Sequence, residues 1–344
     1  MIGSPFIQRE RNSVRLTMLK VMAALIPGTI AHFWFFGPGI VVSLLVCVFF
    51  ALLFEGLALL MRGCCFQNFI SDGSVIVTAW LFALSVPPLA PWWLYAIGLL
   101  FAVIVAKHLY GGLGQNPFNP AMIGYAVLIV SFPNYMTQWP GPAHLVLHMP
   151  SLPEAFDLVF AGQGAISADA YAMASPLDTV KTLLRAGVAK ADILANPVFG
   201  RLSGTGLEWV ALMYLAGGLY LLASRIITWH IPVAFLASVA VSASVLQMLD
   251  PASNMGPVFH LFTASVMLGA FFIATDPVSG CTTPRGKLIF GGLAGFLAIV
   301  IRSYGGYPDG VAFSILIMNV AAPFIDAYTQ PRVYGRAKGG KVGS

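Results

Sequence analysis

The chain has 344 residues, of which 58% are hydrophobic and 9% are charged, and its formal net charge is +5. Soluble domains carry roughly 25% charged residues, so this composition excludes an ordinary soluble globular protein. The sequence also lacks a basic tract with interleaved aromatic residues, which argues against a nucleic-acid-binding protein.

Apolar runs recur along the whole chain, many of them near the length of about 20 residues at which a helix crosses a bilayer. The sequence therefore predicts an all-α, polytopic membrane protein with about ten transmembrane helices. The predicted spans are residues 17–36, 39–61, 73–88, 91–106, 117–132, 207–223, 231–248, 257–274, 288–301 and 310–325. The third, fourth and ninth of these are short. No cleavage-site pattern follows the first run, so we do not expect a removable signal peptide.

A polar interval separates the fifth and sixth predicted spans. At about 70 residues it is far longer than the usual connection, and loops of that length are generally functional or disordered. This one carries its own apolar periodicity and a helix-start signal, so we expect it to be ordered. The predicted domains are an N-terminal segment at 1–16, a first five-helix membrane repeat at 17–135, an extracytoplasmic loop at 136–206, a second five-helix membrane repeat at 207–326 and a basic tail at 327–344.

The distribution of basic residues predicts the orientation, because short cytoplasmic loops carry an excess of Lys and Arg. With ten spans both termini lie on one side, and 13 of the 18 basic residues share that side. The others are Lys181, Arg185, Lys190, Arg201 and Arg302. We therefore expect both termini in the cytoplasm and the long loop outside, in the periplasm where the cell has one.

Two short similarities relate the halves of the chain. The letters KHLYGG at 107–112, before the fifth span, are echoed by RSYGG at 302–306, before the tenth, and the Pro87-Pro88 break is echoed by Asp276-Pro277. Five spans per half is an odd number, so the second copy must be inverted. Inverted repeats with broken helices place binding sites or ion paths near the midplane. Glu55, a carboxylate plainly inside a predicted span, is a candidate for function because ionisable residues are costly in a membrane.

Cysteine usage argues against a metal site within this chain alone. The four cysteines are Cys47, Cys64, Cys65 and Cys281. They form no CxxC motif and no Cys/His cluster, so iron–sulfur or zinc ligation is not expected here. A site shared with a partner's cysteines stays open.

The long loop contains the letters DAYAMASPLDTVKT at 169–182. Ser175 followed by Pro176, with Asp178 two residues further on, predicts an ordinary helix start with Ser175 as the N-cap. A helix N-terminus is also a ready phosphate site, because its free N–H groups and the positive end of its dipole meet there. The residues alone leave both interpretations open.

Three other motifs point to a known family. They are GGLGQNPFNPAM at 111–122, LGAFFIATDP at 268–277 and RSYGGYPDGVAF at 302–313. The chain resembles the D-type subunit of the Rnf (Rsx) ion-translocating oxidoreductase complex. That family is related to the B-type subunit of the sodium-translocating NADH:quinone reductase. The resemblance covers essentially the whole chain, in order.

The resemblance implies a multi-pass subunit of a redox-driven translocase in the lipid of a bacterial inner membrane. Such a protein would not be catalytic alone and would work with subunits of the A, B, C, E and G types. It would relay electrons through FMN in a complex that exchanges electrons between ferredoxin and NAD. This relay would be coupled to transport of Na⁺ or H⁺.

The family attaches FMN through its phosphate to a threonine, in a Ser-Gly-Ala-Thr or similar motif of the large outer loop. The matching position here is Ser175, so the resemblance implies a covalent phosphoester of FMN at Ser175. Around it the implied cofactor-binding residues are Ala174, Pro176, Leu177, Asp178 and Thr179.

The sequence departs from the family motif in two ways. Serine replaces threonine, which retains the necessary hydroxyl, and Ala172-Met173 replaces Ser-Gly. Asp169 stands upstream, where the family often has an acid. Thr179 and Thr182 are neighbouring hydroxyls and therefore alternative attachment sites.

The family also implies a second, non-covalent flavin, either riboflavin or FMN, without assigned residues. The turn at 111–120 contains two Asn-Pro steps beside Gln115. It is either a helix break packed within protein, which satisfies its backbone groups internally, or the lining of a polar cavity for an ion or a flavin ring.

Two rival functions stay open. The first is a channel or transporter for a small solute, because inverted five-helix repeats suit that role and a fold does not decide function. A channel has no need of a long outer loop with a phosphate-ready hydroxyl. The second is a scaffold that only anchors redox partners.

Overall fold

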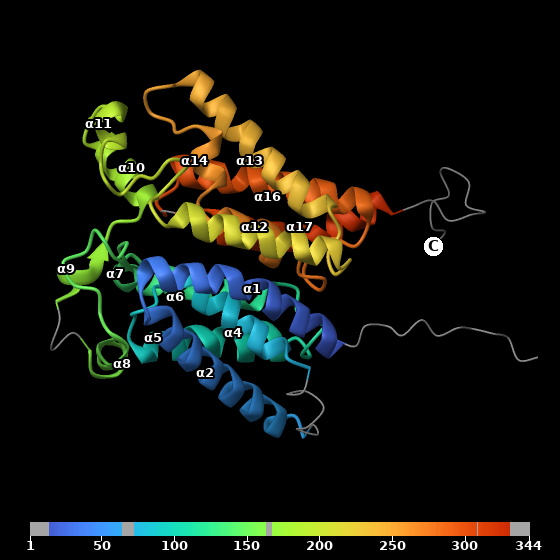
Figure 1. Ribbon diagram of the computed structural model, residues 1–344. Coiled ribbons are helices and arrows are strands. Elements are labelled where there is room, and N and C mark those ends of the chain that lie inside the picture. Colours follow the sequence, from blue (N-terminus) through green and yellow to red (C-terminus); the bar gives the residue numbers. More distant parts are fainter. Residues whose placement is uncertain (1–13, 64–71, 163–166, 308, 331–344) are drawn as a thin grey trace, which may run out of the picture.

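The computed structural model describes residues 14–63, 72–162, 167–307 and 309–330, and nearly all of the regular structure there is helical (Figure 1). Five described helices are long and apolar enough to cross a membrane: α1 (Val14–Phe36), α2 (Gly39–Met61), α13 (His230–Leu249), α16 (Pro284–Tyr304) and α17 (Val311–Thr329). The shorter apolar helices are α4 (Ser74–Ser85), the stretch Trp92–His108, α6 (Pro120–Ser131) and α12 (Leu207–Ala223). The chain is a multi-pass helical membrane protein, as predicted.

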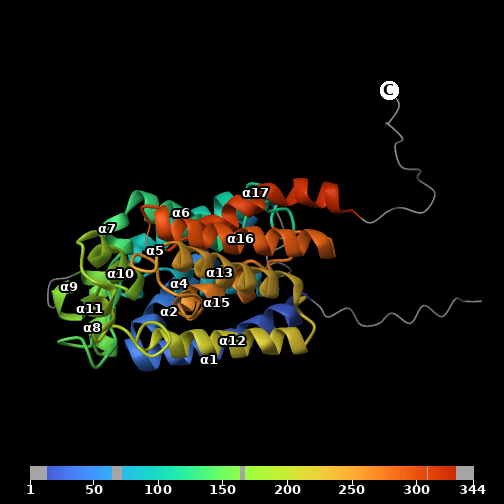
Figure 2. The same ribbon diagram turned by 90° about the horizontal axis from the view of Figure 1, so that it is seen from above.

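The apolar helices lie roughly along one direction, and the short elements of the long loop gather at one end of the bundle (Figures 1 and 2). These elements are α7 (Pro133–Met136), β1 (Trp139–Pro140), α8 (Leu152–Ala161), α9 (Ala168–Tyr171), β2 (Ala172–Met173), α10 (Pro176–Arg185) and α11 (Lys190–Leu194). The strands β1 and β2 pair antiparallel, with Trp139 opposite Met173. The described part of the loop forms short helices and strands, and α1 begins and α17 ends at the opposite end of the bundle.

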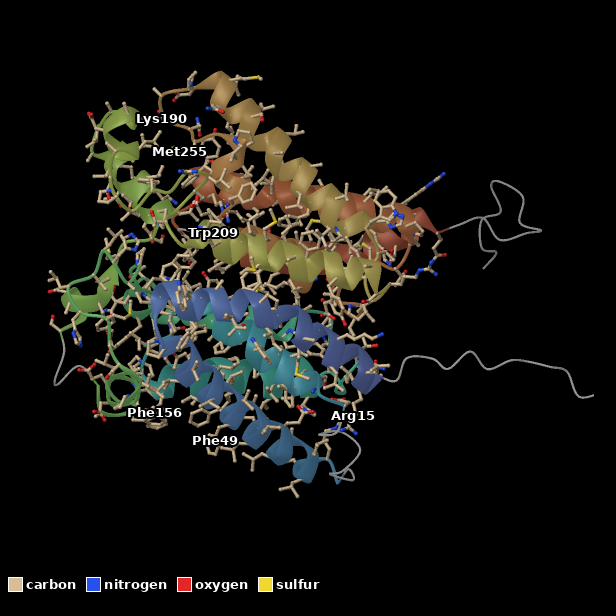
Figure 3. The ribbon with its side chains drawn as sticks, in the orientation of Figure 1. Arg15, Phe49, Phe156, Lys190, Trp209 and Met255 are labelled. Atoms are coloured by element: carbon tan, nitrogen blue, oxygen red, sulfur yellow. The ribbon has the colours of Figure 1, made fainter. Side chains whose placement is uncertain are left out.

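Large apolar side chains cover the outside of the bundle. Trp34 of α1 is 76% exposed and Phe49 of α2 is 61% exposed, and Figure 3 shows Phe49 projecting away from the helices. A water-soluble protein rarely exposes contiguous apolar surface on this scale. These faces suit the apolar interior of a membrane.

The ninth and eighth predicted spans differ most clearly from the observed helices. The ninth, predicted as 288–301, is the 21-residue helix α16, because Thr283 caps it by accepting from the N–H of Gly286 and Pro284 occupies its first turn. The eighth, predicted as 257–274, is interrupted. It consists of α14 (Pro257–Leu261), α15 (Ala264–Leu268) and the π-helical η2 (Gly269–Ile273), with extended backbone at Thr263.

A second π-helix, η1 (Leu100–His108), continues directly from α5 (Trp92–Leu99). It ends in Lys107 and His108, which the sequence placed just outside the span. Both residues are buried and both bind Glu55 of α2, with Lys107 Nζ 2.8 Å from Oε1 and His108 Nε2 2.8 Å from Oε2. Glu55 is thus paired within the helix bundle, which offsets the cost of burying its charge.

The N-termini of α4 and α15 are held in the same way. Lys107 Nζ donates to the hydroxyl of Ser74 at 3.2 Å, and Arg302 of α16 donates to the hydroxyl of Ser265 at 2.8 Å. Arg302 is in turn paired with Asp309, with Nη2 3.0 Å from Oδ1. In each half of the chain, a cation near the end of one helix thereby binds a serine at the start of a short helix.

The first and second halves meet where α1 contacts α12 and α6 contacts α17. Glycine permits the first of these contacts: a Cβ on Gly217 would collide with the backbone carbonyl of Ala24, and one on Gly28 would collide with the ring of Tyr214. The two halves therefore share one tightly packed core.

Candidate functional site

The predicted helix start at Ser175 is confirmed. Ser175 has extended backbone, its Oγ accepts from the N–H of Asp178 at 3.2 Å, and Pro176 occupies the first turn of α10. The Ser175 hydroxyl donates to Oδ2 of Asp178 at 2.7 Å. Ser175 and Asp178 thus each donate one hydrogen bond to the other, which holds the hydroxyl at the N-terminus of the helix.

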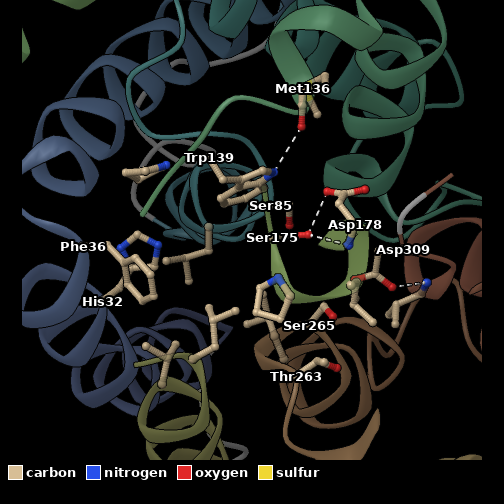
Figure 4. A pocket seen from close by; sticks show the side chains of 18 of the residues that line it. His32, Phe36, Ser85, Met136, Trp139, Ser175, Asp178, Thr263, Ser265 and Asp309 are labelled. Atoms are coloured by element: carbon tan, nitrogen blue, oxygen red, sulfur yellow. Dashed lines mark hydrogen bonds between the residues drawn. The ribbon is translucent and has the colours of Figure 1, made fainter. Parts of the chain in front are cut away.

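Ser175 lies on the wall of a cavity between the membrane helices and the long loop (Figure 4). Its neighbours Ala174, Pro176, Leu177 and Asp178 also line this cavity. Of the expected site residues, Thr179 alone is absent from the lining among the residues described, and it is 9% exposed. The structure therefore brings five of the six together on one surface.

The alternative hydroxyls and the upstream acid lie elsewhere. Thr182 and Asp169 are exposed, and neither lines this cavity. Asp169 belongs to the first turn of the short helix α9. Ser175 is accordingly the hydroxyl of the motif that opens into the cavity.

The walls come from both halves of the chain and are mostly apolar and aromatic. The larger lining side chains are Phe36, Leu84, Met122, Tyr125, Met136, Trp139, Met173, Tyr214 and Leu268. The cavity is partly open and its volume is about 180 Å³. Ligand pockets are typically lined in this way, by apolar and aromatic side chains with a few polar groups that orient the ligand.

His32 of α1 is one of those polar groups. Its ring is tilted by 42° against that of Phe36, with ring centroids 5.1 Å apart, and it lies across the cavity from Asp309 (Figure 4). Its side chain is buried, and its Nδ1 atom has no hydrogen-bond partner among the described residues. Leaving a buried polar atom unpaired costs about 1–3 kcal/mol, so a partner from a ligand would be stabilising.

Two carboxylates, Asp178 and Asp309, face the same space. Burial raises the pKa of Asp178 above its usual value, and the nearby charge of Asp309 adds to the increase. The bond from Ser175 and the charge of Lys181 oppose it. Asp309 is held ionised by its pair with Arg302 and also accepts from the N–H of Val311 at 3.1 Å.

Lys181 attaches α10 to the second half of the chain. Its Nζ donates to the carbonyl oxygen of Gly305 at 2.5 Å and to that of Tyr307 at 2.8 Å. These carbonyls belong to the connection between α16 and α17 that also contains Asp309. The helix that begins at Ser175 is therefore anchored beside one wall of the cavity.

The turn at 111–120 lines neither this cavity nor the one described beside Trp93 and Tyr135. Asn119 caps α6, and its backbone N–H donates to Oδ1 of Asn319 at 3.1 Å. Its side chain donates to the carbonyl oxygen of Ile273 at 3.4 Å. These contacts favour the interpretation of a helix break packed within protein.

Sequence reasoning did not identify His32, Trp139 or Asp309 as neighbours of Ser175. His32 carried a weak signal, because it is a polar residue within the first predicted span. Other predictions lie outside the described residues, namely Cys64, Cys65 and most of the basic residues at the two termini.

Comparison with known proteins extends these observations to the whole sequence. Residues 1–335 match the family described as NQR2, RnfD, RnfE. The chain is 48% identical to the D-type subunit of the ion-translocating oxidoreductase complex of Escherichia coli strain SE11, over an alignment of 347 residues that covers 98% of each chain. Proteins of the same name from Escherichia fergusonii and Shigella boydii serotype 18 are also 48% identical over 98% of each chain.

Proposed function

Because the chain belongs to the NQR2, RnfD, RnfE family, we propose that it is the D-type subunit of an ion-translocating oxidoreductase complex in a bacterial inner membrane. It is not catalytic alone and acts with subunits of the A, B, C, E and G types. It relays electrons between these partners through FMN esterified to Ser175, and the relay is coupled to transport of Na⁺ or H⁺. The observation that carries the proposal is the hydroxyl of Ser175, at a helix N-terminus on the wall of an apolar cavity.

The residues of the cavity fit a flavin nucleotide. The positive end of the α10 dipole suits a phosphate. Of the first three residues of α10, Leu177 alone can offer its N–H, because Pro176 has none and the N–H of Asp178 is bonded to Ser175 Oγ. The apolar and aromatic walls suit a planar ring, and the unpaired Nδ1 of His32 suits the polar edge of such a ring. Lys181 and Arg302 offset the negative charge of Asp178 and Asp309 beside the phosphate position.

Each group of residues has a separate task in this proposal. FMN supplies the electron-carrying ring, and the ester at Ser175 retains it through repeated cycles. The bonds of Lys181 to Gly305 and Tyr307 keep α10 in place, and the apolar walls exclude water from the ring. The second flavin, riboflavin or FMN, remains a prediction without assigned residues.

The proposed fold is ten spans in two inverted five-helix repeats. Five long and four shorter apolar helices, together with the interrupted stretch from α14 to η2, supply the ten. The contacts of α1 with α12 and of α6 with α17 join elements in equivalent positions of the two halves. The bonds of Lys107 to Ser74 and of Arg302 to Ser265 are likewise equivalent, and they support the repeat.

The energy of the coupled process is sufficient for ion transport. Moving one charge against 100 mV costs about 2.3 kcal/mol. One electron that falls through about 100 mV releases about the same free energy. One electron for each ion is therefore enough at that membrane potential. The proposed orientation places both termini in the cytoplasm and the cavity on the periplasmic side.

The proposal is tested with protein produced alongside its maturation enzyme. A denaturing gel should show a fluorescent flavin band that disappears in Ser175→Ala and persists in Ser175→Thr, which restores a hydroxyl. Thr182→Ala is the control, because Thr182 is an exposed hydroxyl in the same segment. Mass spectrometry of the peptide that spans Ser175 identifies the attachment. A band that survives Ser175→Ala would move the site to Thr179 or Thr182.

The rival function, a solute channel without a redox cofactor, is distinguished by colour. Purified channel protein would be colourless, as would a scaffold that only anchors partners, whereas oxidised flavin absorbs blue light. The fit of the cavity at Ser175 favours the electron carrier.

A further inference from the structure

Four buried side-chain atoms have no hydrogen-bond partner among the described residues: the Nδ1 atoms of His32, His230 and His260, and the Oγ atom of Ser203. Of these four residues only His32 lines the cavity that contains Ser175. The unpaired atom on the wall of this cavity is therefore an imidazole nitrogen, on a different side from the attachment site.

The surroundings of His32 limit what it can bind. Phe36 covers one side of the imidazole, and Leu84, Tyr214 and other apolar residues line the cavity around it. A neutral imidazole has one donor and one acceptor nitrogen, and one that donates from Nδ1 needs an acceptor. A ligand with its own polar edge supplies one, and the pyrimidine end of a flavin ring carries carbonyl oxygens and ring nitrogens.

We propose that His32 donates a hydrogen bond to the pyrimidine edge of the flavin ring and thereby raises its reduction potential. This inference rests on the proposed function, because it assumes that the flavin is attached at Ser175. Figure 4 shows the two residues on different sides of one space, so a ring attached at Ser175 would share that space with His32. His32 is a positioning and tuning residue, and the electron is carried by the ring.

The direction of the effect follows from charge. Reduction makes the ring more electron-rich, so a donor at its edge binds the reduced ring more tightly than the oxidised one. A single hydrogen bond to a buried partner changes the relative affinity roughly tenfold. For a two-electron couple a tenfold change equals about 30 mV. Removal of the donor should therefore lower the midpoint potential by about this amount.

The experiment compares His32→Leu, which removes the donor, with His32→Gln, which retains one. His230→Gln is the matched control, because His230 also has an unpaired buried Nδ1 but does not line the cavity. Midpoint potentials are measured by spectroelectrochemical titration, and the mass of the Ser175 peptide is measured in every variant. We expect His32→Leu to retain the added mass and to have the lower potential. His32→Gln should fall between His32→Leu and the unsubstituted protein, and His230→Gln should match the unsubstituted protein.

The outcomes separate this inference from the proposed function. If the Ser175 peptide carries the added mass but His32→Leu leaves the potential and the absorption spectrum unchanged, the role of His32 is wrong and the attachment stands. A peptide of unmodified mass in the unsubstituted protein overturns both. If His32→Leu does not accumulate, redox-difference infrared spectra of protein with isotope-labelled histidine decide. A labelled imidazole band that shifts on reduction and is missing in His32→Gln supports the bond, and its absence overturns it.

Discussion

The hydroxyl of Ser175 donates to Oδ2 of Asp178 at 2.7 Å, while the N–H of Asp178 donates back to Oγ of Ser175 at 3.2 Å. Asp178 therefore serves as a partner for the hydroxyl in the protein before esterification. An ester at Ser175 removes the hydroxyl proton and with it one of the bonds that hold the carboxylate. The pKa of the Asp178 carboxyl group is therefore a property of this site that can be measured.

Asp178→Asn should change how stability depends on pH. Burial raises the pKa of Asp178 above the usual value of about 4, so the folded protein binds this proton more tightly than the unfolded chain. The stabilising contribution of the protonated form is complete below the usual pKa and is lost as pH rises through the raised pKa. Asparagine does not titrate, so the melting temperature of Asp178→Asn relative to the unsubstituted protein should increase from pH 4 to pH 7.

Thermal unfolding in nanodiscs at several pH values measures this difference. Asp169→Asn is the control, because Asp169 is an exposed residue of the same loop that does not line the cavity. A difference that is constant with pH, or that decreases as pH rises, would contradict the raised pKa of Asp178.

Lys181→Met should release α10 from the connection between α16 and α17. The substitution removes both bonds from Nζ to the carbonyls of Gly305 and Tyr307. Hydrogen bonds to charged groups contribute about 1.5–3 kcal/mol, so opening of α10 should become roughly 10- to 100-fold more frequent. Hydrogen exchange followed by mass spectrometry should show faster exchange in peptides from Pro176–Arg185.

Lys190→Met provides the matched comparison, because Lys190 Nζ binds the carbonyls of Pro251 and Asn254 and so holds the neighbouring helix α11 (Figure 3). It should accelerate exchange in α11 and leave α10 unchanged. Equal exchange of α10 in Lys181→Met and in the unsubstituted protein would show that Lys181 does not anchor the helix.

Substitution of one partner in the buried pair of Glu55 and Lys107 should lower stability more than substitution of both. Glu55 is 1% exposed and Lys107 is 3% exposed. Loss of one partner leaves an uncompensated buried charge, which costs about 3–5 kcal/mol. We expect Glu55→Gln and Lys107→Met each to lower the melting temperature and the yield, and the double variant to recover part of both. A double variant that equals the sum of the two single effects would exclude the pairing.

Gly217→Val should destabilise the contact between α1 and α12. A Cβ at Gly217 meets the backbone carbonyl of Ala24, which cannot move without shifting the helix. Overpacking of this kind costs about 1–3 kcal/mol. Gly292→Ala is the control on α16, because a Cβ there meets nothing within 4 Å. Gly217→Val should have a lower melting temperature than Gly292→Ala. A Gly217→Val variant that melts at the temperature of the unsubstituted protein would mean that the helices do not approach so closely.

Local signals predicted much of the fold. The hydrophobicity of residues 207–223 gave α12 without error, and Ser175 followed by Pro176 gave the start of α10. Where polar residues belong to a helix, hydrophobicity was insufficient. The first turn of α16, beginning at Pro284, looks like a loop because it contains Arg285 and Lys287, and only the cap at Thr283 shows otherwise.

The sequence did not predict contacts between residues that are far apart in the chain. The pair of Glu55 with Lys107 joins residues 52 positions apart, and the cavity brings His32 together with Asp309. Spacing along one helix or loop contains no information about such neighbours. The motif therefore identified the hydroxyl, but not the walls around it.

Those walls include His32 near the beginning of the chain and Ala312 near its end. A ribosome delivers α1 to the membrane well before α17, so the enclosure is complete only after the last helix has been inserted. Until then one side of Ser175 lacks the covering it has in the finished protein. If Ser175 is esterified as proposed, the order of synthesis sets a period during which the modifying enzyme would meet an open hydroxyl.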